Sequence, residues 1–150
     1  MSCADIRVLG ISGGIGSGKS VVSRLLSLLG IPIFDCDREA KSLYDSDAQL
    51  KKQLLVRFGE GLYPEGQFAS RALAQIIFED PLARREVEQM VHPAVLRRFD
   101  QWKQQQGCPL VALESAILFS SGFDKFCTDV LWVFAPVIAQ SSGKPWIRAA

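Results

Sequence analysis

The chain has 150 residues, of which 48% are hydrophobic and 22% are charged, and its formal net charge is +1 at pH 7. This composition is typical of a folded globular domain and is too apolar for an intrinsically disordered protein. A chain of this length can bury a core without disulfides or a structural metal, which excludes the small disulfide-stapled scaffolds. We therefore expect one domain.

The charge and hydropathy patterns argue against nucleic acid and membranes as partners. Lys and Arg together number 17 and Asp and Glu 16, with no long basic run, so we expect no nucleic-acid interface. The longest apolar stretch, residues 130–139, contains Pro136 and is shorter than the ~20 residues of a membrane-spanning helix. The N-terminus lacks the order of a signal peptide, and the four cysteines form no C-x-x-C pair. These features predict a cytoplasmic protein with reduced, mostly buried thiols.

The first predicted elements are a strand, a glycine-rich loop and a helix. Residues 6–11 are apolar enough for a buried strand that ends in the glycine cluster of residues 13–16. A helix is predicted to begin near Lys19 and to end at Gly30. Its buried face is predicted from residues at i, i+3, i+4 and i+7, namely Val22, Leu25, Leu26 and Leu29.

The middle of the chain is predicted to be helical. Residues 31–34 form a short second strand that leads to Asp35 and Asp37. From Arg38 to about Gln106 the pattern predicts an insertion of helices at residues 39–44, 48–58, 71–78 and 81–105. Pro93 is expected to divide the last of these helices, and residues 63–66 are expected to form a loop.

Two further apolar runs complete the predicted sheet. Residues 109–113 end in Glu114, and residues 130–134 form a similar run. Both are typical of strands buried on two faces of a parallel sheet. The alternation of strands and helices predicts an α/β fold, a parallel sheet flanked by helices.

The strongest motif is a phosphate-binding loop, G-x-x-x-x-G-K-[ST], matched by Gly13-Gly14-Ile15-Gly16-Ser17-Gly18-Lys19-Ser20. Glycines let successive N–H groups turn toward an anion, and the helix N-terminus adds positive potential. Lys19 would contact the β- and γ-phosphates, and the Ser20 hydroxyl would bind Mg²⁺. A glycine-rich turn with an incidental lysine is the alternative, but the strand before the loop and the helix after it favour a nucleoside triphosphate site.

Two aspartates follow the second predicted strand. In extended geometry Asp35 and Asp37 would point the same way, toward the crevice where open α/β sheets bind ligands. One of them could accept the proton of an attacking hydroxyl. The alternative is that Asp37 only caps the helix that begins at Arg38.

Glu114 and His92 are candidates with equally plain alternatives. Glu114 ends an apolar strand, as a metal-binding acid of phosphate-loop enzymes does, and could reach the metal through water; it could also be an exposed strand-end charge. His92 is the only histidine, and a helix-end or core hydrogen-bonding role is favoured over catalysis.

The sequence resembles the dephospho-CoA kinase family. Residues 11–20 and 29–37 are similar to its Thr-Gly-Gly-Ile-Gly-Ser-Gly-Lys-Ser loop, Leu-Gly pair and Asp-x-Asp pattern, and residues 77–81, His92-Pro93 and 114–119 resemble later landmarks. The resemblance covers roughly the first 136 residues. It implies transfer of the γ-phosphate of ATP to the ribose 3′-hydroxyl of dephospho-CoA, with ATP and Mg²⁺ as cofactors.

The resemblance also implies roles for individual residues. Asp37 matches the catalytic base, beside Lys19, and the helical insertion matches the part that grips the CoA moiety. Asp35 and Arg71 are then expected on the substrate side, and His92 has a substrate-side or structural role. Ser20 and Glu114 are expected on the metal side. The implied nucleotide-binding residues are Gly13, Gly14, Ile15, Gly16, Ser17, Gly18, Lys19, Ser20 and Val21.

The chain departs from the family pattern at several positions. Val21 stands where a threonine is usual and leaves only a backbone N–H for phosphate, Ser70 stands where an arginine is usual, with Arg71 next to it, and Ser120 replaces a glutamate. After about Pro136 the pattern of a lid helix, a further strand and a closing helix is not matched. We interpret residues 137–150 as a loose tail of a truncated or frame-shifted product that lacks the C-terminal part of the fold, with the missing strand leaving an apolar edge.

Two other functions remain open from the sequence. The first is a remnant that binds nucleotide or CoA without turnover. The lid helix of the family carries an arginine, and an arginine on the transferred phosphoryl group is worth about 10³–10⁵ in rate, so a chain without the lid could bind its ligands and fail to react. The second is a related small-molecule kinase, such as a nucleotide or shikimate kinase, which the Asp-x-Asp and His-Pro landmarks disfavour. The sequence does not determine the oligomeric state.

Overall fold

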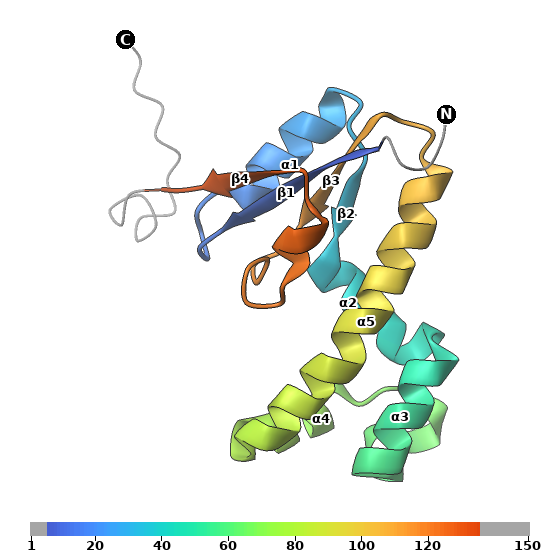
Figure 1. Cartoon of the computed structure of the whole chain (residues 1–150). Coiled ribbons are helices and arrows are strands. Elements are labelled where there is room, and N and C mark those ends of the chain that lie inside the picture. Colours follow the sequence, from blue (N-terminus) through green and yellow to red (C-terminus); the bar gives the residue numbers. More distant parts are fainter. Residues whose placement is uncertain (1–5, 136–150) are drawn as a thin grey trace. The chain divides into compact units, whose positions relative to one another are not determined.

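The structure is a computed structural model that describes residues 6–135. By its internal contacts the chain divides into two compact units, one of Met1–Asp35 with Lys103–Ala150 and one of Cys36–Trp102. The first unit contains a sheet and the second is helical (Figure 1). The predicted tail at residues 137–150 lies outside the described residues. None of the described helices is long and apolar enough to cross a membrane.

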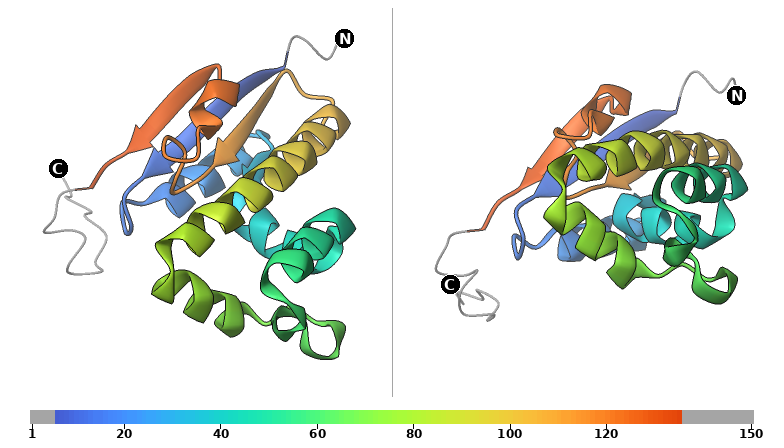
Figure 2. Two further views of the ribbon diagram at one scale, coloured as in Figure 1. Left: turned by 60° about the horizontal axis from the view of Figure 1, so that its bottom comes forward. Right: turned by 90° about the horizontal axis from the view of Figure 1, so that it is seen from below.

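The sheet unit is a parallel α/β fold, as predicted. Its elements are β1 (Arg7–Gly13), α1 (Lys19–Leu28), β2 (Ile33–Asp35), β3 (Leu110–Glu114), the 3₁₀ helix η4 (Phe123–Phe126) and β4 (Asp129–Val133). The strand order is β2-β3-β1-β4 and each neighbouring pair is parallel. Helix α1 lies along one face of this sheet (Figure 2). Because all strands run the same way, their carboxyl ends meet at one edge, where α/β sheets bind ligands.

The core of this unit lies along the central strands. Ile11 of β1 and Val111, Ala112 and Leu113 of β3 are fully buried, and Phe34 of β2 is nearly so. These are the residues that the apolar runs placed in strands, and burying each of them contributes about 1.5–3 kcal/mol, less for the alanine. The core of the sheet unit is therefore built from β1, β2 and β3.

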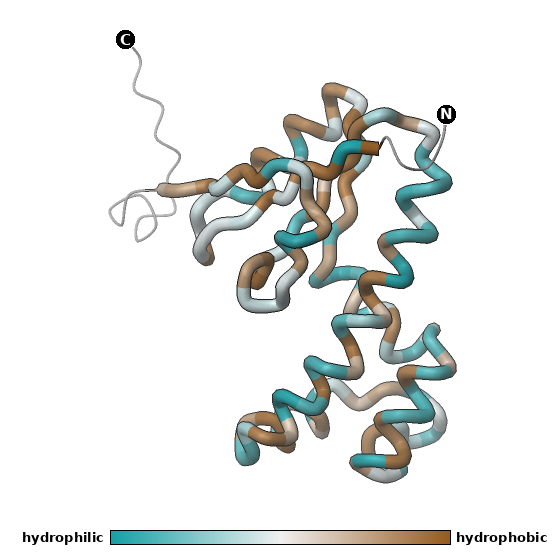
Figure 3. Tube along the Cα trace, viewed as in Figure 1, coloured by the Kyte–Doolittle hydropathy of each residue, from teal (hydrophilic) through white to brown (hydrophobic). Residues whose placement is uncertain are grey.

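Strand β4 is exposed, in contrast to the prediction that residues 130–134 are buried on both faces. Among the described strands β4 lies at an edge, next to β1 only, and its residues are largely accessible, with Trp132 56% exposed. Figure 3 shows hydrophobic residues along β3 and in β4 alike. An apolar run indicates that a strand can be buried, but it does not determine whether other elements pack on both of its faces.

The predicted buried stripe of α1 is also only partly buried. Leu25 and Leu29 are 56% and 77% exposed, and the buried residue of this helix is Ser23. Helix α1 packs on β1 and β2 through one side, so the apolar residues that face away from the sheet stay accessible. The prediction was wrong because an apolar stripe wider than the contact cannot be buried by one neighbour.

The second unit consists of helices joined by short turns. They are α2 (Cys36–Ser46), α3 (Ala48–Phe58), the 3₁₀ helices η2 (Glu60–Leu62) and η3 (Pro64–Gly66), α4 (Ser70–Glu79) and α5 (Pro81–Gln105). Helix α3 begins as an N-cap predicts, because the Asp47 carboxylate accepts from the Leu50 N–H at 2.9 Å. It ends at Gly59, whose φ of 84° favours glycine.

Helix α5 continues through Pro93, in contrast to the predicted division at this residue. Proline removes one N–H from the helix and costs about 3 kcal/mol in an interior position. Val91 precedes Pro93 and Ala94, Val95 and Phe99 follow it, and all four are buried. Packing on both sides of the proline offsets its local cost. The predicted loop at residues 63–66 likewise contains η3.

Candidate functional site

The glycine-rich loop lies between the end of β1 and the start of α1. Gly16 and Gly18 have φ values of 73° and 99°, which only glycine adopts readily. The Ile15 side chain at the tip of the loop is 94% exposed, so the loop presents backbone rather than side chains to its interior. The glycines therefore do what the motif predicts, because they turn the chain sharply between a buried strand and a helix.

Backbone donors remain available in this loop. The amides of Gly16, Gly18, Lys19 and Ser20 donate to no acceptor among the described residues, and the Gly18 N-cap adds no side-chain hydrogen bond. Unpaired N–H groups together with the positive end of a helix form an anion-binding site. The Val21 N–H was predicted to be left for a phosphate, but in the structure it donates to the Gly18 carbonyl at 3.1 Å.

The side chains of Lys19 and Ser17 add further polar groups to the phosphate-binding loop, which together with its unpaired amides forms the phosphate cradle. The Lys19 ammonium donates to the carbonyls of Gly13 at 2.8 Å and Gly14 at 3.1 Å, which leaves one of its three donors for a ligand. The Ser17 hydroxyl is buried and lacks a hydrogen-bond partner among the described residues. A buried orphaned hydroxyl costs about 1–3 kcal/mol, and a phosphate oxygen would satisfy it. The loop thus fits a polyphosphate.

Gly13 lies in close contact with the neighbouring strand β4. This contact predicts that a larger residue at position 13 lowers the stability. A Cβ at this position would lie 2.2 Å from the Val133 carbonyl oxygen and 2.7 Å from Ser17 Oγ, whereas a Cβ at Gly14 would meet nothing within 4 Å. We expect Gly13→Ala to lower the free energy of unfolding by about 1–3 kcal/mol and Gly14→Ala to change it by less than about 0.5 kcal/mol. Denaturant unfolding of both variants measures the difference, and equal stabilities would contradict the loop geometry.

Acidic residues lie at the same edge of the sheet. Asp35 ends β2 and is paired in register with Glu114, which ends β3. The hydroxyl of Ser23, on α1, donates to Glu114 Oε2 at 2.5 Å, and Ser20 lies exposed in the first turn of the same helix. No group of three or more His, Cys, Asp or Glu side chains among residues 6–135 could hold a metal alone. Oxygen donors in this small number suit Mg²⁺, which keeps water and binds substrate phosphates.

Asp37 lies on a helix, not on an extended segment. Strand β2 ends at Asp35 and α2 begins at Cys36, so the predicted extended geometry from Asp35 to Asp37 is wrong. Capping of a helix that begins at Arg38 is also wrong, because Asp37 is already within the first turn. An acidic residue there is stabilised by the helix dipole. Asp37 is exposed and therefore accessible to a ligand.

The other predicted substrate residues belong to the helical unit. Arg71 is exposed in the first turn of α4, and His92 is half-buried in α5. Burial lowers the pKa of His92 below its ordinary value of 6.5, and the Glu88 carboxylate opposes this shift. The imidazole is therefore neutral at pH 7, where it can both donate and accept a hydrogen bond.

This pKa shift predicts a pH dependence of stability. Because the folded state binds the His92 proton less readily than the unfolded state, stability is lost as the pH falls below about 6.5. His92 is the only histidine, so one ring signal in an NMR titration reports its pKa, which we expect below 6.5. In Glu88→Gln the pKa should fall further, since the carboxylate raises it. A pKa at or above 6.5 would contradict the shift.

Ser17 and Ser23 were not singled out individually by sequence reasoning as buried polar residues. Ser17 was named only as one of the nucleotide-binding residues of the loop, and Ser23 lies among apolar residues of α1. A serine that falls on the sheet-facing side of a helix is a weak signal, because such residues are also common on exposed faces. The contact of Ser23 with Glu114 joins positions 91 residues apart, which a local pattern cannot indicate.

A parallel sheet whose first strand runs through this loop into a helix is the architecture of P-loop kinases. The dephospho-CoA kinase family profile matches residues 7–142. The chain therefore belongs to the dephospho-CoA kinase family.

Individual relatives agree with this assignment. The dephospho-CoA kinase of Porphyromonas gingivalis is 45% identical over 128 residues, which are 85% of this chain and 63% of the relative. That of Bacteroides fragilis is 37% identical over 130 residues, with 86% and 63% covered. The chain thus spans about 63% of the length of these curated relatives.

Solved structures show the same fold. The crystal structure of TT1252 from Thermus thermophilus has a TM-score of 0.78 and 33% identity, with 93% of this chain and 74% of that chain covered. The dephospho-CoA kinase from Campylobacter jejuni has a TM-score of 0.64 at 19% identity, with 82% and 64% covered. At this identity the second likeness concerns the fold alone.

Proposed function

We propose that the protein transfers the γ-phosphate of ATP to the ribose 3′-hydroxyl of dephospho-CoA, which gives coenzyme A and ADP. The observation that carries this proposal is the complete phosphate loop at the carboxyl end of β1, in a chain whose family profile is that of dephospho-CoA kinase. ATP and dephospho-CoA are the proposed small-molecule partners. The reaction favours a cytoplasmic location, where ATP is available.

The loop would bind the phosphates of ATP and stabilise the charge that develops during transfer. Its unpaired amides and the remaining Lys19 donor are positioned before the nucleotide binds. Donors that are fixed in advance stabilise a transition state without reorganising. Phosphoryl transfer depends largely on such positioning and electrostatic stabilisation, so this part of the site would supply much of the rate.

Ser20 and Glu114 would hold Mg²⁺, with Asp35 nearby in register. When bound, the ion supplies neutralisation of charge on the β- and γ-phosphates. The chain contributes oxygen ligands and their orientation, because the Ser23 hydroxyl fixes one carboxylate oxygen of Glu114. An oriented carboxylate loses less conformational entropy when it engages a ligand.

Asp37 would accept the proton of the attacking hydroxyl. In this step the ribose 3′-oxygen forms a bond to the γ-phosphorus, the bond from that phosphorus to the β,γ-bridging oxygen breaks, and ADP leaves. The exposed carboxylate of Asp37 takes the hydroxyl proton. Arg71 and His92 are the proposed residues of the helical unit that bind the acceptor.

Release of ADP by the chain with and without dephospho-CoA tests the proposed function. We expect ADP release that depends on dephospho-CoA, with one coenzyme A formed for each ADP. Binding of ATP without any turnover would instead support the non-catalytic binding protein. Turnover with AMP or shikimate in place of dephospho-CoA would indicate a different small-molecule kinase.

A further inference from the structure

A buried serine on α1 forms a hydrogen bond that the glycine-rich loop motif does not include. Ser23 is the buried residue of this helix and is 7% exposed. Its hydroxyl donates to Glu114 Oε2 at 2.5 Å, which is the length of a charge-assisted O–H···O bond and stronger than a neutral one. Because a buried hydroxyl without a partner costs stability, the packing of α1 favours keeping this bond.

The bond connects the two elements that carry the two parts of the proposed site. Ser20 and Ser23 are three residues apart on α1, so they lie on the same side of the helix. Ser20 belongs to the phosphate loop motif, and Glu114 ends β3. Helix α1 packs on β1 and β2, and the Ser23 hydroxyl extends its contacts to β3. The helix that begins at the phosphate loop is thereby joined to the proposed metal carboxylate.

The sheet fixes the backbone of Glu114, which leaves its side chain as the variable part. Glu114 is in register with Ile11 of β1 on one side and with Asp35 of β2 on the other. The next N–H, that of Ser115, donates to the Ile11 carbonyl at 3.0 Å. A glutamate side chain still has several rotatable bonds, and ordering them lowers the affinity for a ligand. The Ser23 hydroxyl holds one carboxylate oxygen and leaves the other available to a cation.

The charge of Glu114 is available as well. The ion pairs within residues 6–135 involve other acidic residues. The Glu114 side chain is half-buried, where charges are screened less than at the surface. Carboxylates that are withdrawn from water are usually paired or bind a metal. A cation bound beside Ser20 would therefore meet a carboxylate that no lysine or arginine of the described chain neutralises.

We propose that Ser23 is a positioning residue that couples Mg²⁺ binding to nucleotide binding, by holding the Glu114 carboxylate against the helix of the phosphate loop. Without the hydroxyl, the carboxylate would have to be ordered when the ion binds, so Mg²⁺ would increase the affinity for ATP less. The loop amides and Lys19 do not depend on this bond, so the affinity for ATP without Mg²⁺ would stay the same. The inference rests on the proposed use of ATP with Mg²⁺, but it requires neither the acceptor nor turnover.

Calorimetric titration of the whole chain with ATP, once in Mg²⁺ and once in EDTA, tests the coupling. The Kd in EDTA divided by the Kd in Mg²⁺ measures how much the ion strengthens nucleotide binding. Ser23→Ala should lower this ratio about two- to tenfold, the effect of having to immobilise one side chain, and should leave the Kd in EDTA unchanged. Ser27→Ala removes an exposed hydroxyl one turn further along α1 and should keep the ratio of the unchanged chain.

Two results of this titration would overturn the proposal. One is an unchanged ratio in Ser23→Ala. The other is an equal loss of affinity in Mg²⁺ and in EDTA, because a structural defect of α1 alone would weaken both.

A double variant tests whether Ser23 acts through Glu114. Glu114→Gln should itself lower the ratio, since the amide no longer supplies a carboxylate to the ion. Adding Ser23→Ala to Glu114→Gln should lower it no further, because residues that act as a unit are not additive. Independent, additive losses would overturn the proposal.

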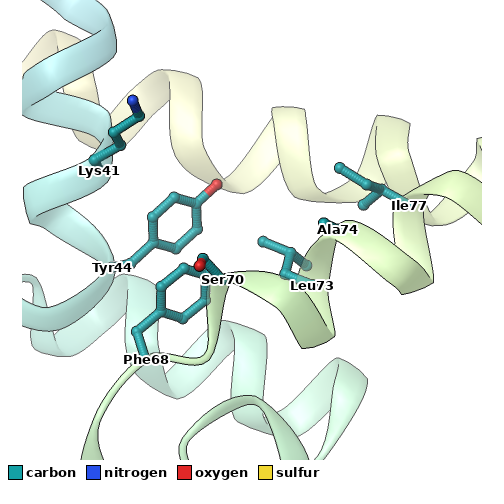
Figure 4. A pocket seen from close by; sticks show the side chains of 7 residues that line it. All are labelled: Lys41, Tyr44, Phe68, Ser70, Leu73, Ala74 and Ile77. Atoms are coloured by element: carbon teal, nitrogen blue, oxygen red, sulfur yellow. The ribbon is translucent and has the colours of Figure 1, made fainter.

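Acceptor binding is a control, because it is proposed for the other unit. The helical unit contains a cavity of about 450 Å³ between α2 and α4, whose lining includes Tyr44, Phe68 and Ile77 (Figure 4). Ser23 belongs to the sheet unit, so Ser23→Ala should leave the affinity for dephospho-CoA unchanged. A loss of that affinity equal to the loss for ATP with Mg²⁺ would overturn the proposal.

Turnover separates this inference from the proposed function. A chain that shows the Ser23 effect on ATP binding but makes no coenzyme A would support the inference and contradict the proposed kinase reaction. A chain that makes coenzyme A, with the same ratio in Ser23→Ala as in the unchanged protein, would support the reaction and overturn the inference.

Discussion

Replacing Lys19 with alanine should weaken ATP binding by the intact chain about 10- to 100-fold. The ammonium lies at the mouth of the phosphate loop, held by the carbonyls of Gly13 and Gly14, and one donor remains for a phosphate oxygen. A hydrogen bond to a charged group is worth about 1.5–3 kcal/mol, and each 1.4 kcal/mol changes affinity tenfold. Calorimetric titration with ATP in the presence of Mg²⁺ measures the change.

A second lysine of the same unit serves as the control for this variant. Lys125 lies exposed on η4, so Lys125→Ala removes the same charge without touching the loop and should retain the affinity of the unchanged chain. Lys19→Ala also removes contacts to two carbonyls, so its unfolding free energy is compared as well. Equal ATP affinity in Lys19→Ala and the unchanged chain would contradict the proposed phosphate cradle, whatever the stability.

Local sequence signals were sufficient to predict helix bounds and glycine positions, because each of these features depends on a few neighbouring residues. Helix α3 spans Ala48–Phe58 and α5 spans Pro81–Gln105, the same bounds that the apolar periodicity predicts. Gly16 and Gly18 have the positive φ values for which the loop motif requires glycine. These predictions succeed because the signal and its cause lie within a few residues of each other.

Burial depends on neighbours that a local pattern does not contain. The apolar residues of α1 and β4 are equally apolar whether or not another element covers them, and Leu29 and Trp132 are largely exposed. The start of α2 was missed for a related reason. Asp37 is a good N-cap by residue type, but β2 ends at Asp35 because that residue is the last to pair with β3, and the helix follows at once.

Contacts between distant segments account for the rest of what was missed. The stacked pair of Tyr44 and Phe68 joins α2 to the segment before α4. Lys41, one turn earlier on α2, lines a cavity together with this pair. Each residue alone resembles an ordinary helix or loop residue. Only the packing of the helices turns them into one surface, which is why this cavity could not be predicted from spacing.

The role of Asp37 predicts a loss of turnover without a loss of nucleotide binding. A positioned general base contributes about 10²–10⁴-fold to a rate, so Asp37→Asn should lower kcat for coenzyme A formation by about that factor. The amide keeps the shape of the side chain but cannot take the hydroxyl proton. The affinity for ATP should be unchanged, since the phosphate loop is untouched, and coupled measurement of ADP release gives kcat and KM.

Asp35→Asn tests whether the loss of kcat is specific to Asp37 or follows from the loss of any nearby carboxylate. Asp35 is the proposed substrate-side residue at the end of β2, so its replacement should raise KM for dephospho-CoA more than it lowers kcat, since ground-state binding and transition-state chemistry respond differently. Glu60→Gln removes an exposed carboxylate from η2 and should leave both constants as they were. If Asp37→Asn retained the kcat of the unchanged chain, proton transfer would have to be assigned to another acceptor, and the exposed position of Asp37 at the start of α2 would then serve helix stability alone.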